Sequence, residues 1–145
     1  MHLYNILRGK GNNVFSIEPG ATVMHAIEIL VEHNIGALLV VENGRPAGII
    51  TERDVLRLSR KDPSLLATTP VADVMTSDLI VGQPDDDVER TMAVLSEAHI
   101  RHLPIMDGDK IAGMISIGDL VKSQLQEGAV TIHYLRDYIT GHRTL

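Results

Sequence analysis

The stretch GIITERD, at Gly48–Asp54, recurs as GMISIGD at Gly113–Asp119. Each copy runs glycine, two apolar residues, a hydroxyl residue, two variable residues and aspartate. The same shift of 65 positions aligns ten identical residues between Pro19 and Asp54 without a gap, where background composition gives about two or three. The chain is therefore internally duplicated, and its fold is best sought as a pair of similar units.

Each copy predicts the same order of elements, roughly β–α–β–β–α. A short apolar segment precedes a proline, and a helix of about three turns follows it. Thr22 and Asp87 are suitable N-cap residues for these two helices. The apolar residues at helical spacing are Val23, Ile27, Leu30 and Val31 in the first copy and Val88, Met92, Leu95 and Ala98 in the second.

Two strands joined by a tight turn follow each of these helices. Asn-Gly in ENGR and Asp-Gly in DGDK are hairpin signals. A second helix is expected to begin near Glu52 and near Ile117. The strands are apolar on both faces, which suits a sheet covered by helices on one side and by the other copy on the second. The predicted fold class is mixed α/β (α+β), with two pseudo-symmetric units packed through their sheets.

The duplication also gives a division of the chain. We expect a first domain over residues 1–65, which includes the N-terminal segment. A second domain, with its preceding linker, covers residues 66–127. Residues 128–145 form a tail, in which Ile132, Leu135 and Ile139 have helical spacing.

Composition narrows the class of protein. The chain has 145 residues, of which 44% are hydrophobic, with one Phe and no Trp, so its core is aliphatic. A net charge of −6 argues against a general affinity for nucleic acid or anionic membranes. Without cysteine there is no disulfide, thiolate metal site or cysteine nucleophile. The N-terminal residues do not read as a signal peptide, and no apolar run reaches membrane-spanning length, so we expect a soluble cytoplasmic protein.

The doubled unit resembles a tandem pair of CBS domains, named after cystathionine β-synthase. The resemblance rests on HNIGALLVVENGRPAGIITERD and AHIRHLPIMDGDKIAGMISIGD, and it covers roughly Val14 to Glu127. The opening ILRGKG and the closing LRDYITG also resemble stand-alone bacterial CBS-pair proteins. The resemblance implies a regulatory module without catalytic residues, which forms a homodimer and binds an adenosine ligand such as AMP, ADP, ATP or NAD(H). The effector protein that it would regulate is unknown.

By this resemblance, two clefts form between the copies. The first uses Ser116 and Asp119, with Arg101 and His102 beside them, and a base slot from Asn12, Asn13, Val14, Ile35, Gly36 and Ala37. The second uses Thr51, Arg53 and Asp54, beside Gly36 and Ala37, and a base slot from Met75, Ser77, Leu79 and Ile100.

The chemistry of the motif suits this role. A carboxylate can accept hydrogen bonds from both hydroxyls of a ribose. The first N–H groups of the following helix and its dipole favour a phosphate. Arg101 and His102 can hold phosphate, whereas Gly36 and Ala37, their counterparts, cannot. The two clefts are therefore expected to differ in affinity, and the cations Arg53, Arg101 and His102 favour a phosphorylated ligand over S-adenosylmethionine.

Other interpretations remain beside this one. Each aspartate could serve only as a helix cap, and Lys10 is a weaker candidate for a phosphate contact. The histidines lack metal-ligand spacing, so no metal is expected. No nucleophile triad or Walker loop supports an enzyme. The main alternative to a nucleotide sensor is a structural dimerisation module with vestigial pockets.

Overall fold

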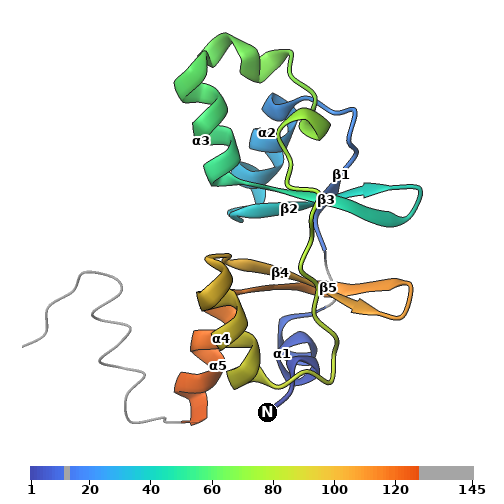
Figure 1. Ribbon diagram of the computed structural model, residues 1–145, viewed down its shortest axis with the longest axis vertical. Coiled ribbons are helices and arrows are strands. Elements are labelled where there is room, and N and C mark those ends of the chain that lie inside the picture. Colours follow the sequence, from blue (N-terminus) through green and yellow to red (C-terminus); the bar gives the residue numbers. More distant parts are fainter. Residues whose placement is uncertain (12–13, 128–145) are drawn as a thin grey trace, which may run out of the picture.

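The computed structural model describes residues 1–11 and 14–127, and it consists of two similar halves (Figure 1). The first half contains β1 (Ser16–Ile17), α2 (Val23–His33), β2 (Ala37–Glu42), β3 (Arg45–Thr51) and α3 (Glu52–Lys61). The second half contains α4 (Val88–Ala98), β4 (His102–Asp107), β5 (Lys110–Ser116) and α5 (Ile117–Glu127). Two 3-10 helices, η1 (Pro63–Ala67) and η2 (Val71–Asp73), connect the halves, and helix α1 (Leu3–Lys10) precedes both.

The two sheets face each other in the middle of the molecule, and helices cover the outer side of each sheet (Figure 1). The first sheet has the order β1-β2-β3, and β4 pairs with β5 in the second. Strands β3 and β5 contact each other across the interface between the sheets. The predicted fold class, two pseudo-symmetric α/β units packed through their sheets, is confirmed.

Local details of the duplication also agree with the sequence. The Thr22 hydroxyl accepts a hydrogen bond from the His25 N–H, and the Asp87 carboxylate accepts one from the Arg90 N–H, so both predicted N-caps are present. The β2–β3 and β4–β5 ladders both shift register at the same place, between Val40 and Val41 and between Ile105 and Met106. The two hairpins thus share one geometry.

Two residues of the predicted apolar helix stripes face outward. Val31 is 74% exposed, although Val23 and Leu30 on the same helix are buried. Ala98, at the end of α4, is also exposed, whereas Leu95 is buried. The buried face of each helix is therefore narrower than the sequence predicted.

Helix α1 packs on the second half, although it precedes the first half in the chain. Leu3 and Leu7 belong to the apolar core that contains Leu95, Ile105 and Ile115. The Leu3 N–H donates to the Asp86 carbonyl at 3.0 Å. This packing differs from the expected division, which placed the N-terminal segment in the first domain.

The segment around η2 covers the first half in the same manner. The Val71 N–H donates to the Ala21 carbonyl at 2.7 Å. The side chain of Met75 lies over Gly48, where an added Cβ would be 2.6 Å from its sulfur. Leu7 lies over Gly113 in the equivalent position, with its Cδ2 2.5 Å from an added Cβ. Each half is thus covered by the segment that precedes the other half.

The predicted tail helix around Ile132, Leu135 and Ile139 lies outside the described residues. Within residues 1–11 and 14–127, no helix is long and apolar enough to span a membrane.

Candidate functional site

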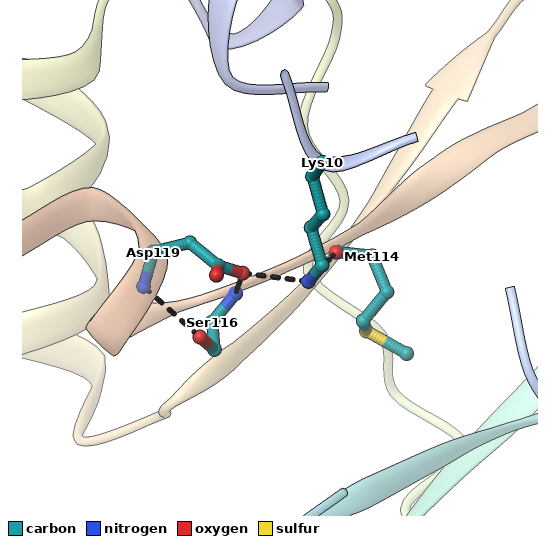
Figure 2. Close-up of polar contacts among 4 residues, drawn as sticks. All are labelled: Lys10, Met114, Ser116 and Asp119. Atoms are coloured by element: carbon teal, nitrogen blue, oxygen red, sulfur yellow. Dashed lines mark hydrogen bonds and ion pairs between the residues drawn. The ribbon is translucent and has the colours of Figure 1, made fainter. Parts of the chain in front are cut away.

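The second copy of the repeated motif forms a hydrogen-bonded turn where β5 meets α5. The Ser116 N–H donates to Asp119 Oδ2 at 2.9 Å, and the Asp119 N–H donates to Ser116 Oγ at 3.1 Å. This reciprocal arrangement is a capping box, and it fixes the carboxylate at the start of the helix. Figure 2 shows the pair together with Lys10, which reaches Asp119 from the end of α1.

A cavity of about 290 Å³ lies beside this turn, between the two halves. One side is formed by Ser116, Asp119 and His102 of the second half. The opposite side is formed by Ile35, Gly36 and other residues of the first half. The full lining is Val14, Phe15, Asn34, Ile35, Gly36, Ala37, His102, Met114, Ser116 and Asp119. The cavity therefore combines a carboxylate, a hydroxyl and an imidazole with apolar surface and glycine backbone.

The residues expected in the first cleft meet here for the most part. Val14, Ile35, Gly36, Ala37, His102, Ser116 and Asp119 all line the cavity. Arg101 is exposed and is not part of the lining, but its carbonyl accepts a hydrogen bond from the Ile117 N–H at 2.8 Å. Asn12 and Asn13 lie outside the described residues. Whether the gathered side chains bind a ligand remains a prediction.

Three residues that line the cavity, Phe15, Asn34 and Met114, were not predicted. Lys10, which contacts Asp119, was named only as a weaker candidate for a phosphate contact. Phe15 is the only phenylalanine of the chain, and its ring stacks on His33 with 4.0 Å between the ring centroids. A lone aromatic residue beside the expected base slot was the one sequence signal that could have identified it.

The two halves approach closely at Gly36. An added Cβ at this position would be 3.0 Å from Glu52 Oε1 and 3.3 Å from the His102 ring. A side chain here would require Glu52 and the His102 ring to shift by a few tenths of an ångström.

Asp119 is held in its charged form. Its partial burial would raise the pKa of the carboxyl, but the hydrogen bonds from Lys10 and the Ser116 N–H, together with the charge of Lys10, place the pKa below its ordinary value. The carboxylate is thus an ionised acceptor at neutral pH, as binding to ribose hydroxyls requires.

The second predicted site has the same capping box, but a different cation lies near its carboxylate. Asp54 Oδ2 accepts hydrogen bonds from the Thr51 N–H at 2.9 Å and from the Thr51 hydroxyl at 3.1 Å. Asp54 is only 9% exposed, and Arg57 Nη1 lies 3.9 Å from Oδ1. Arg53 is exposed, and Met75 is turned toward Gly48. This carboxylate is buried and does not line the cavity at Asp119.

The remaining residues of the second predicted set are dispersed over the second half and the linker. Ser77 is exposed and Leu79 is half-buried. Ile100 packs against the core of the second half. Gly36 and Ala37, which were assigned to both clefts, line the cavity at Asp119.

Comparison with known proteins identifies the family. A family model described as CBS domain matches the chain twice, over residues 11–61 and 71–126. The chain belongs to the CBS-domain family. Its two halves are the two CBS domains of a tandem pair, and the duplication in the sequence is the trace of that pair.

Among relatives of this CBS pair, the mitochondrial CBS domain-containing protein CBSX3 of Arabidopsis thaliana is 38% identical over 125 residues, which are 83% of this chain and 61% of that protein. The CBS domain-containing protein YhcV of Bacillus subtilis is 34% identical over 113 residues, which are 77% of this chain and 79% of that protein. Among solved structures, the CBS pair of protein MJ0100, in complex with 5′-methylthioadenosine and S-adenosyl-L-methionine, matches with a TM-score of 0.76 and 24% identity, over 89% of this chain and 98% of that one. At this identity the match supports the fold.

Within the CBS pair, His102 is kept neutral. Burial is the main cause of its lowered pKa, the charge of Lys10 and that of Arg101 lower it further, and Glu52 and Asp119 oppose the shift. A neutral imidazole still has one N–H donor to offer a ligand.

The lowered pKa of His102 predicts a loss of stability on acidification. As the pH falls below about 6.5, the ordinary pKa of histidine, His102 is protonated in the unfolded chain but remains neutral in the folded chain. The free energy of unfolding therefore decreases until the folded pKa is passed. We expect the melting temperature of the wild type to fall more steeply between pH 7.5 and 5.5 than that of His102→Gln. If the melting temperatures of the two proteins fall in parallel with pH, the lowered pKa of His102 is contradicted.

Proposed function

We propose that this CBS pair is a regulatory module that binds an adenosine nucleotide, AMP, ADP, ATP or NAD(H), in the cavity at Ser116 and Asp119. The observation that carries the proposal is the meeting of an ionised carboxylate at a helix start with the apolar and glycine residues of the other half, around one cavity. No catalytic activity of its own is proposed.

The carboxylate is suited to the ribose. Asp119 Oδ2 is engaged by Ser116 and Lys10, and none of the residues in the described part of the chain donates to Oδ1. A ribose hydroxyl can therefore bond to Oδ1 without breaking the capping box. The first N–H groups of α5 and its dipole lie beside this point and favour a nearby phosphate.

The opposite wall is suited to the base. Val14, Phe15 and Ile35 give apolar surface, and Gly36 and Ala37 also line the cavity. Flat apolar surface near backbone donors and acceptors fits a purine ring. The adenosine ligands of the MJ0100 pair support this class of ligand.

The charges around the cavity favour a phosphorylated nucleotide. The cations Lys10 and Arg101 lie close enough to His102 to lower its pKa, and Asp119 and Glu52 are the nearby acids. Lys10, Arg101 and the N–H of His102 could therefore pair with a phosphate. A sulfonium ligand would add a positive charge next to Lys10. We therefore propose AMP, ADP, ATP or NAD(H) in preference to S-adenosylmethionine.

We also propose that the module forms a homodimer. Apolar side chains are exposed on its helices, with Val31 at 74%, Leu56 at 67% and Val94 at 43%. Burial of these side chains against a second copy would remove apolar surface from water. Ligand binding would then change the geometry between CBS domains or between copies, to the extent that the ligand prefers one state.

Calorimetric titration of the purified protein with AMP, ATP, NADH and S-adenosylmethionine tests the proposal, with the oligomeric state of the same samples measured by sedimentation. We expect micromolar binding of at least one phosphorylated nucleotide and weaker binding of S-adenosylmethionine. Absence of binding by all four, in a protein that sediments as a dimer, would favour the alternative of a structural dimerisation module.

A further inference from the structure

Lys10 lies in the N-terminal segment, which is longer than the equivalent part of the linker. The pairing of Ile17 with Val40 is equivalent to the bridge between Gly82 and Ile105, 65 positions later. Leu7 and Met75 are also equivalent, since each covers the corresponding glycine of the other half's hairpin.

The chain between these equivalent points differs in length. Leu7 and Ile17 are ten positions apart, whereas Met75 and Gly82 are seven apart. The N-terminal segment is thus three residues longer, and Lys10 lies in this longer stretch, at the last position of α1. In the linker, the corresponding helix is η2, which is only three residues long and ends at Asp73.

The longer segment places an ammonium group on the carboxylate of one cleft. Lys10 Nζ lies 2.6 Å from Asp119 Oδ2 and 2.7 Å from the Met114 carbonyl oxygen (Figure 2). The side chains of Lys10 and Asp119 are 39% and 27% exposed. In the first half, Asp54 is instead approached by Arg57 of its own helix, at 3.9 Å. The two carboxylates of the repeat therefore have different cationic partners.

We propose that Lys10 determines the charge of the ligand that this cleft accepts. The inference rests on the proposed function. A neutral ligand bound at Oδ1 leaves the ammonium on Asp119 Oδ2 and the Met114 carbonyl oxygen, so it gains no contact from Lys10. An anionic ligand offers the ammonium a phosphate oxygen in exchange, and the flexible lysine side chain can turn from Asp119 to that oxygen. Lys10 thus favours phosphorylated ligands over neutral ones.

A comparison of AMP with adenosine tests this role, since the two differ only in the phosphate. We expect the wild type to bind AMP at least about tenfold more tightly than adenosine, because charge-assisted hydrogen bonds are the stronger ones. In Lys10→Met, AMP binding should weaken by about tenfold, while adenosine binding stays the same or strengthens because Asp119 is released. Lys10→Arg should keep the preference for AMP.

Lys61→Met is the matched control, because Lys61 is the last residue of α3 as Lys10 is of α1. It should leave both affinities unchanged. If Lys10→Met weakens AMP and adenosine by the same factor, Lys10 only supports the fold and the inference is overturned, while the proposed function stands. If the wild type binds AMP and adenosine equally, the inference is also overturned. If the wild type binds neither these nor the other nucleotides, the proposed function itself fails.

Discussion

Asp119→Ala is expected to weaken binding of the nucleotide by about 100-fold, whereas Asp54→Ala should change the affinity by less than a few fold. Hydrogen bonds to a charged acceptor contribute about 1.5–3 kcal/mol each, so loss of the bonds to a ribose reaches this magnitude. The cavity includes Asp119, whereas Asp54 does not line it and is only 9% exposed. Calorimetric titration with the tightest nucleotide of the panel measures both affinities.

Asp54→Ala is a close control, because both aspartates hold the same position of the repeated motif and both cap a helix. Thermal unfolding of the two variants shows that each is folded at the temperature of titration. Loss of binding in Asp54→Ala alone would place the ligand in the other cleft. Equal loss in both variants would mean that the two caps act through the fold.

Gly48→Ala is expected to destabilise the protein by about 1–3 kcal/mol, as overpacking of a well-packed site does. The added methyl would lie 2.8 Å from the Thr76 carbonyl oxygen as well as close to the Met75 side chain. The side chain of Met75 can move, but the Thr76 backbone is fixed by two hydrogen bonds to Ile49, each of 2.9 Å. The added methyl should therefore weaken the hydrogen bonds between Thr76 of the linker and Ile49 of β3. Denaturant unfolding measures the change.

Gly9→Ala provides the contrast to this variant. Gly9 is in α1, and nothing lies within 4 Å of an added Cβ. Alanine should stabilise the helix by roughly 0.5 kcal/mol, because glycine loses more backbone entropy on folding. A Gly48→Ala protein as stable as the wild type would show that the linker is not held against β3 as described.

Local signals in the sequence were sufficient to predict the helices and hairpins of the repeated unit. Thr22 and Asp87 precede apolar periodic segments, and Asn43-Gly44 adopts the two positive φ angles, 53° and 76°, that this dipeptide favours in hairpins. These features depend on neighbours in the chain, so they can be predicted residue by residue. The pairing of the two sheets followed from strands that are apolar on both faces.

The position of α1 could not be predicted in the same way. Its residues lie outside the ten aligned identities, and its equivalence with the linker is offset from the repeat by the three additional residues. The contact of Lys10 with Asp119 joins positions 109 residues apart. Phe15, which lines the cavity, directly precedes β1, and β1 pairs in parallel with β2. A strand of two residues is too short for this pairing to be predicted from the sequence.

The exchange of covering segments has a consequence for synthesis of the chain. Leu3 and Leu7 leave the ribosome before every strand of both sheets, yet the surface that they cover includes β5, the last strand of the pair. The first contacts of α1 with the second half are to Pro84 and Asp86, and its contact with Asp119 comes last. The first CBS domain, by contrast, receives its cover from η2 soon after its own last helix is complete. The earlier domain can therefore fold during translation, while α1, although made first, must wait until the later domain that it covers has been made.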